Sequence, residues 1–150
     1  MKIYLASDHA GYALKEYLRR HLEGPGFEIE DCGAFSFDPN DDYPKFIRLA
    51  ARGVANDPER HKAIILGGSG EGEAMVANRY KGVRATVFYG GSMDIIKLSR
   101  EHNDANVLSL GAQFLNIDEV KRAIDLFIET KFEGGRHQRR IEKVSKLENS

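Results

Sequence analysis

The segment AIILGGSGEGE (residues 63–73) decides the fold class, because a run of aliphatic residues passes directly into a glycine-rich turn. A short apolar run bounded by turn residues is typical of a buried strand. Similar runs, rich in Ile, Val, Leu and Tyr, occur at residues 2–7, 27–32, 84–89 and 106–111. We therefore predict five strands.

Helical patterns lie between these runs. The first combines an apolar stripe, spaced three and four residues apart, with charged residues outside it: the stripe is Leu14, Tyr17, Leu18 and Leu22, and the outer residues are Lys15, Glu16, Arg19 and Arg20. A second helix is predicted to begin at Asp42, whose side chain caps free amides ahead of Pro44. Further helices are predicted near 72–80 and 92–101.

The clearest helical pattern covers residues 117–128. Asn116 and Glu119 match a capping pair, and an apolar face follows, made of Ile117, Val120, Ile124 and Ile128. Strands that alternate with helices in this way predict right-handed crossovers and a mostly parallel sheet with helices on both faces. The expected class is α/β, a three-layer α/β/α, Rossmann-like arrangement.

One domain is expected over residues 1–150. Its last part, 134–150, is basic and carries apolar residues at helical spacing, which predicts a C-terminal helix or tail that packs on its own domain or on another subunit. With 22 basic and 23 acidic residues, the net charge of −1 offers no bulk attraction to nucleic acid or to an anionic membrane. We expect neither partner.

The N-terminal run in MKIYLASDHAG is too short for a signal-peptide core or a membrane span, so we expect a cytoplasmic protein. Cys32 is the only cysteine, which excludes an internal disulfide and a cysteine-rich metal site. It is predicted to be a buried structural thiol. His21 and His61 lie in charged surface contexts and are given no role.

Two strand ends carry the chemistry, because ligands of open α/β sheets bind beyond the carboxyl ends of the strands. SDHAG (7–11) follows the first strand, and GGSGEGE (67–73) follows the third. The glycine-rich segment lacks the Lys and Ser or Thr of a P-loop, and two carboxylates would repel a pyrophosphate, which argues against a nucleotide site. It suits a developing oxyanion, with the Ser69 hydroxyl and successive backbone amides as donors and a carboxylate of the same segment as a base. The alternative is that Glu71 and Glu73 only complement a helix dipole.

A second group of polar residues precedes the fifth strand. His102, Asn103 and Asp104 should lie at the opposite end of the sheet from Asp8 and Ser69, so a dimer must join them if they act together. In the basic tail, Arg136, Arg139 and Arg140 form either a phosphate clamp or a solvated face.

Together these segments resemble the type B ribose-5-phosphate isomerases and the related galactose-6-phosphate and allose-6-phosphate isomerases. The resemblance is carried in order by SDHAG (7–11), DYP (42–44), GGSGEGEAMVANRYKGVRA (67–85), EHNDANVLSLGA (101–112) and GGRHQRRI (134–141). It implies a five-stranded parallel sheet between helices, and a homodimer or dimer of dimers with active sites at the interface. It implies no metal and no cofactor.

The resemblance also implies residue roles. Many members carry a cysteine base at the position of Gly67, whereas this chain is similar to the subgroup in which the base matches Glu73 and Ser69 holds the substrate and the enediolate. The remaining roles are ring opening assisted by His102, binding or activation of sugar hydroxyls by Asp8, substrate positioning by Tyr43 and Asn103, phosphate binding by His9, Arg136 and Arg140, and an anion hole from the amides of Gly70 to Ala74, including Gly72. Many members have Arg in the phosphate site where this chain has Gln113, which leaves the preferred sugar open.

The expected reaction is the interconversion of D-ribose 5-phosphate and D-ribulose 5-phosphate by proton transfer through an enediolate. The alternatives are an isomerase of a hexose 6-phosphate, either allose or galactose 6-phosphate, a non-catalytic sugar-phosphate binding subunit, and a nucleotide-binding regulatory module.

Overall fold

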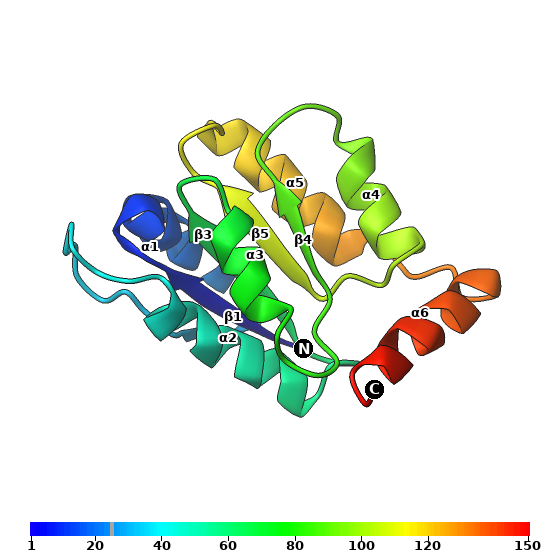
Figure 1. Cartoon of the computed structure of the whole chain (residues 1–150). Helices are drawn as coiled ribbons and strands as arrows, with labels where there is room; N and C mark the ends of the chain where they lie inside the picture. The colour runs from blue at the N-terminus through cyan, green and yellow to red at the C-terminus, as the bar shows by residue number, and fades with distance from the viewer. Residues whose placement is uncertain (25) are drawn as a thin grey trace.

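The five predicted strands form one parallel sheet in the computed structural model, which describes residues 1–24 and 26–150 (Figure 1). The strands are β1 (Lys2–Ser7), β2 (Glu28–Asp31), β3 (Lys62–Gly67), β4 (Ala85–Phe88) and β5 (Val107–Gly111). Their order is β2-β1-β3-β5-β4, and every neighbouring pair is parallel. The predicted α/β class and the parallel sheet are confirmed.

Helices cover both faces of the sheet. They are α1 (Tyr12–Glu23), α2 (Pro44–Asn56), α3 (Glu71–Ala77), α4 (Asp94–Glu101), α5 (Ile117–Glu129) and α6 (Arg136–Leu147), and a short 3₁₀ turn, η1 (His9–Gly11), precedes α1. Each predicted helix is present, and the one expected near 72–80 is shorter. No helix within the described residues is long and apolar enough to cross a membrane.

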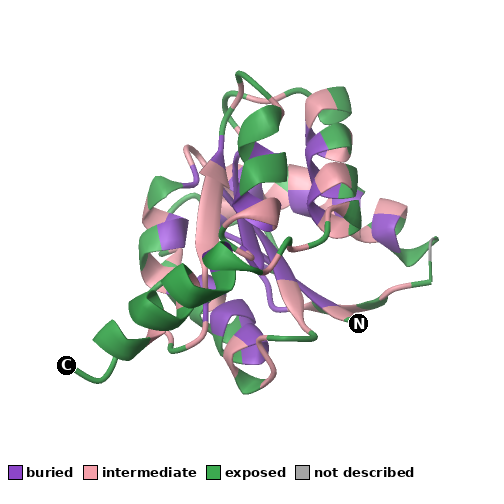
Figure 2. Ribbon diagram, turned by 90° about the vertical axis from the view of Figure 1, so that its right-hand side faces the viewer, coloured by how far each residue is buried: buried purple, intermediate pink, exposed green. Residues whose placement is uncertain are grey.

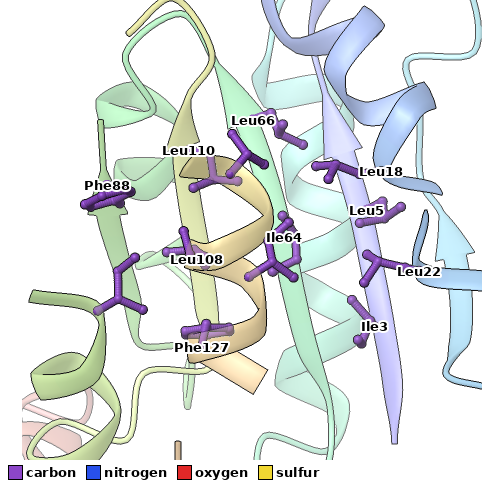
Figure 3. Packing of buried hydrophobic residues seen from close by; sticks show 14 of the residues in the cluster. Ile3, Leu5, Leu18, Leu22, Ile64, Leu66, Phe88, Leu108, Leu110 and Phe127 are labelled. Carbon is purple, nitrogen blue, oxygen red and sulfur yellow. The ribbon is translucent and has the colours of Figure 1, made fainter. Parts of the chain in front are cut away.

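Two apolar cores fill the space between the layers, because side chains alternate between the faces of a strand. On one face, Ile3, Leu5 and Ile64 pack against α1, α4 and α5 (Figure 3). On the other, Tyr4 and Ile65 pack against α2 and α3. Both faces of the central strands are therefore buried, as the burial colours of Figure 2 show, and the strands read as continuous apolar runs.

The chain diverges between β1 and β3, and this places the site. From β1 it turns into α1 on the first face, whereas from the neighbouring β3 it turns into α3 on the opposite face (Figure 1). The connections separate at this point, beyond the carboxyl ends of the two strands, and this is where ligands of open α/β sheets bind.

The helix caps are partly as predicted. Asn116 accepts a hydrogen bond from the amide of Glu119, and the Glu119 side chain accepts one from the amide of Asn116, so the capping box of α5 is confirmed. The cap expected at Asp42 is wrong. Tyr43 is the N-cap of α2, without a side-chain cap bond, and the helix begins at Pro44, whose missing N–H leaves one fewer donor to satisfy.

Lys15 is a second correction, because it lies inside the protein. Its side chain is fully buried, with Nζ 2.7 Å from Asp31 Oδ2 and 3.0 Å from Glu16 Oε1. Helical spacing alone places it outside the apolar stripe, but that side of α1 packs beside the edge strand β2, which carries Asp31. The ion pair therefore ties α1 to the edge of the sheet.

We expect Asp31→Asn to lower the free energy of unfolding by about 3 kcal/mol, because it leaves a fully buried ammonium with a single remaining carboxylate partner. Urea unfolding followed by circular dichroism measures the loss. Glu28→Gln in the same strand is the control, because it removes an exposed ion pair with Lys2 and should change stability by less than about 1 kcal/mol. Equal losses of unfolding free energy in the two variants would contradict a stabilising role for the buried ion pair of Lys15 and Asp31.

Candidate active site

The glycine-rich turn after β3 fixes where α3 begins. Gly70 has a φ of 84°, in the left-handed region that favours glycine, and a Cβ there would lie 3.1 Å from the main chain of Leu110. Its carbonyl accepts a hydrogen bond of 2.6 Å from Ser109 Oγ. These contacts hold the turn against the end of β5, so that α3 starts at Glu71 with its first amides unpaired along the helix.

The amides of this turn are only partly free. Ser69 Oγ accepts a hydrogen bond of 3.2 Å from the amide of Glu71. The amides of Gly70 and Gly72 make no backbone hydrogen bond within the described part of the chain. Ala74 is different, because its amide donates to the carbonyl of Gly70 at 3.1 Å. This corrects the expectation for Ala74, whose amide the helix already uses.

Glu73 projects inward from the first turn of α3, and only 4% of it is exposed. Its carboxylate lies against Gly67, at the end of β3, so closely that a Cβ at Gly67 would overlap it. Burial raises the pKa of Glu73, and the nearby negative charge of Asp8 raises it further, while a hydrogen bond from its own backbone amide lowers it. The structure thus places a buried carboxylate with a raised pKa at the carboxyl end of β3.

The first strand supplies a second acidic group and a histidine. Asp8 is buried and accepts a hydrogen bond of 3.0 Å from the amide of Ala10, which caps η1. His9 Nδ1 lies 2.7 Å from Asp41 Oδ1, and this hydrogen bond is the main cause of a raised His9 pKa. A carboxylate, a second carboxylate and a partly exposed imidazole therefore meet at the ends of β1 and β3.

Two further predicted residues lie at the same end of the sheet, beyond the carboxyl ends of the strands. Tyr43 packs over the turn, because a Cβ on Gly72 would come within 2.6 Å of the Tyr43 hydroxyl oxygen. Gln113, just beyond β5, lies beside Gly68, with its side-chain carbon 3.3 Å from a Cβ built there. The carboxyl end of the sheet thus brings together Asp8, His9, Tyr43, the turn residues Ser69 to Glu73, and Gln113.

The remaining predicted residues lie at the other end of the sheet. His102 ends α4 and precedes β5, Asn103 follows it and is exposed, and Arg136 and Arg140 are exposed on α6. The predicted separation of His102 from Asp8 and Ser69 is confirmed by their places before β5 and after β1 and β3. One copy of the chain therefore presents two polar groups at opposite ends of the sheet.

His137, which the sequence analysis did not select, joins the second group. Its ring stacks on that of His102, with 4.2 Å between centroids and 12° between planes, and only 7% of the residue is exposed. Burial and the neighbouring His102 lower the pKa of His137. The HNDA and GGRHQRR segments gave no signal for this contact, because 34 residues separate the two histidines in the chain.

Other interpretations of single residues also changed. Cys32 is buried, as predicted, and burial raises its pKa to about 12, which makes it a poor nucleophile. His61 is partly buried, contrary to the surface context inferred for it, and its ring lies edge-on to Tyr4 at 5.8 Å between centroids.

Among the described residues, two clusters have ligand atoms within 4.8 Å of one another, as a bound metal ion requires: His102 with Glu133 and His137, and Asp8 with His9 and Asp41. In the first, the stacked rings are nearly parallel, so their nitrogen lone pairs cannot converge on one ion without rotating a ring. In the second, Nδ1 of His9 is already hydrogen-bonded to Asp41. We assign a metal to neither.

Comparison with known proteins matches this architecture to one family. The model of the ribose/galactose isomerase family matches residues 3–144. The chain belongs to the ribose/galactose isomerase family. Ribose-5-phosphate isomerase B of Mycolicibacterium paratuberculosis is 40% identical over 151 aligned residues, which cover 100% of this chain and 93% of that protein. The enzyme of the same name from Escherichia coli is 35% identical, and the alignment covers 98% and 96% of the two chains.

Solved structures of the family have the same fold. Ribose-5-phosphate isomerase B of Mycoplasma genitalium, solved with bound ribulose-5-phosphate, superposes with a TM-score of 0.95 at 40% identity and covers 99% of this chain and 97% of its own. The enzyme from Clostridium thermocellum gives a TM-score of 0.91 at 36% identity, with 99% and 98% covered. The five-stranded α/β arrangement is therefore that of the ribose/galactose isomerase family.

We expect Glu73→Gln to raise the thermal unfolding temperature at pH 8, because it removes a charge whose burial the folded state disfavours. Because the pKa of Glu73 is higher in the folded than in the unfolded protein, its charge does not lower the free energy of unfolding below the unfolded-state pKa. The loss of stability grows as the pH rises from there through the folded-state pKa. The gain should therefore vanish below about pH 4. Scanning calorimetry from pH 4 to pH 8 measures it.

Glu71→Gln is the matched control for this measurement. Glu71 lies in the same first turn of α3 but is exposed, so its charge stabilises the helix N-terminus and its removal should not raise the unfolding temperature. A Glu73→Gln variant that unfolds at the wild-type temperature at every pH would show that the carboxylate carries no burial cost.

Proposed function

We propose that this chain is a type B ribose-5-phosphate isomerase that uses Glu73 as its carbon base. One observation carries the proposal: the Glu73 carboxylate is buried against Gly67 at the carboxyl end of β3, in space that any side chain at position 67 would fill. The names of the relatives and the ribulose-5-phosphate bound in the Mycoplasma genitalium enzyme support the substrate. We also propose that the protein works in the cytoplasm.

The proposed reaction begins with the ring form of ribose 5-phosphate. His102 assists ring opening, in which the proton of the C1 hydroxyl must leave and the ring oxygen must gain one, and Asp8 binds or activates the sugar hydroxyls. Glu73 then removes the proton from C2, and the electron pair forms the C1–C2 double bond of an enediolate. Ser69 and the amides of Gly70 and Gly72 stabilise the negative oxygen. The hydroxyl proton then passes from O2 to O1, and return of the carbon-bound proton from Glu73 to C1 gives ribulose 5-phosphate.

Burial of Glu73 suits this step. A base removes a proton most effectively when its pKa approaches the pH at which the enzyme works, and burial moves the pKa of this carboxyl in that direction. Tyr43, held over Gly72, is proposed to position the sugar beside the turn. The Gln113 side chain lies beside Gly68. Its neutral amide is proposed to offer the phosphate hydrogen bonds without adding a positive charge.

We further propose that the working enzyme is a homodimer, or a dimer of dimers, with shared sites. Glu73 and His102 lie at opposite ends of the sheet in one copy, so one reacting sugar can contact both only when a partner subunit contributes one of them. The partner is proposed to contribute His102, Asn103, Arg136 and Arg140. The exposed guanidinium groups of α6 are then available for the phosphate.

We expect Glu73→Gln to lower kcat about a hundredfold or more while KM changes little, because glutamine keeps the shape but is a far poorer base. Coupled assays of ribulose 5-phosphate formation give both constants. Glu71→Gln, which removes an exposed carboxylate of the same turn, is the control and should retain near wild-type turnover. Wild-type turnover in Glu73→Gln would refute the assigned base and leave the family membership intact.

Shared sites predict that two inactive variants complement each other. In a hybrid dimer of Glu73→Gln and His102→Asn subunits, one site keeps both wild-type residues and the other loses both. An equal mixture, after unfolding and refolding together, should therefore recover about a quarter of wild-type activity, since half of the dimers are hybrids and each has one intact site. Recovery of no activity, with hybrids verified by mass spectrometry, would contradict a shared site.

A further inference from the structure

We propose that Asp41 is a positioning residue that fixes the ring of His9, so that the outer nitrogen of the imidazole donates a hydrogen bond to the phosphate of the substrate. The inference rests on the proposed function for the identity of the phosphate-bearing ligand. Asp41 lies in the loop between β2 and α2, 32 residues from His9 in the chain.

One carboxylate oxygen holds His9 at two points. Asp41 Oδ1 accepts a hydrogen bond of 3.0 Å from the backbone amide of His9 and lies 2.7 Å from Nδ1 of its ring. The hydrogen bond from the backbone amide fixes the main chain after β1, and the hydrogen bond at the ring fixes Nδ1 as the nitrogen that faces Asp41. Nε2 therefore points away from Asp41, and it makes no hydrogen bond with any residue that the structure describes.

The Asp41 carboxylate is buried, and its hydrogen bonds are made with His9. Its side chain is only 8% exposed, and its second oxygen, Oδ2, is buried without a hydrogen-bond partner. A buried carboxylate is costly unless a cation or donors compensate it, and His9 supplies both of its hydrogen bonds. The ion pair with a protonated His9 is thus the contact that makes this burial tolerable.

The surroundings of His9 favour the same form of the ring. The hydrogen bond to Asp41 is the main cause of the raised His9 pKa, and the charges of Asp8, whose Oδ2 lies 4.0 Å from Nδ1, Asp41 and Asp38 raise it further. Phe37 lies edge-on to the ring at 6.3 Å between centroids, with 82° between the planes. The His9 side chain is 35% exposed, which leaves Nε2 open to a ligand, and a protonated ring there would suit a phosphate dianion.

Asp41→Asn tests the proposal. Asparagine keeps the size and an acceptor for the backbone amide of His9 but loses the charge, so we expect KM for ribose 5-phosphate and the inhibition constant of inorganic phosphate to rise about tenfold, with kcat within about threefold of wild type. The neighbouring Asp42→Asn is the control, because Asp42 is exposed and its side chain makes no hydrogen bond within the described residues. Unchanged constants in Asp41→Asn would overturn the proposal.

A second measurement needs no turnover and begins with the wild-type protein. Nitrogen chemical shifts of the wild-type His9 ring, followed against pH by NMR, report which nitrogens carry protons. The proposal requires a His9 that titrates above the ordinary histidine pKa, with both nitrogens protonated at neutral pH. A neutral His9 ring at pH 7 overturns it. In Asp41→Asn the titration should move to lower pH.

These readouts separate this inference from the proposed function. Wild-type protein that isomerises no ribose 5-phosphate, but whose phosphate binding weakens in Asp41→Asn, would refute the isomerase and support the role of Asp41. An active wild type whose Asp41→Asn variant keeps its KM, phosphate inhibition and His9 titration would refute the role of Asp41 alone.

Discussion

The contact between the Glu73 carboxylate and Gly67 is the constraint on which the site depends. Gly67 pairs with Gly111 across β3 and β5, and neither position has room for a side chain. A Cβ at Gly67 would overlap the carboxylate, and one at Gly111 would lie 2.6 Å from the carbonyl oxygen of Ser69. One glycine therefore makes room for the base, and its neighbour on the adjacent strand makes room for the turn that carries the oxyanion donors.

The two glutamates of the turn, which sequence alone leaves equivalent, differ in their surroundings. Glu71 is exposed at the first position of α3, where a negative charge complements the helix dipole at little desolvation cost. Glu73 is buried, and burial raises its pKa. A residue selected only to complement the dipole gains nothing from burial, because desolvation opposes the charge that the dipole favours. Dipole complementation thus accounts for Glu71 but not for Glu73.

Local periodicity predicted the strands, most helices and the glycine-rich turn, because those signals lie within a few residues of one another. It failed where a distant segment decides. Lys15 is buried because Asp31 of the edge strand neutralises it, and His9 is oriented by an aspartate 32 residues away. The Ala74 amide was misjudged because the exact start of a helix determines which amides remain free. The split between the two ends of the sheet was predictable, since strand order along the chain fixes which residues precede and which follow a strand.

Under the proposed function, the stacked pair of His102 and His137 explains how two groups from a partner subunit reach one sugar together. His137 is buried in the first turn of α6, next to Arg136, and its ring lies on the residue proposed to open the sugar ring. The stack therefore fixes the start of α6 relative to the end of α4. The ring-opening group and the phosphate-binding Arg136 would then move as one unit, so docking of the partner sets both ends of the substrate at once. The exposed apolar residues Val144 and Leu147 further along α6 leave a surface on the same helix for such docking.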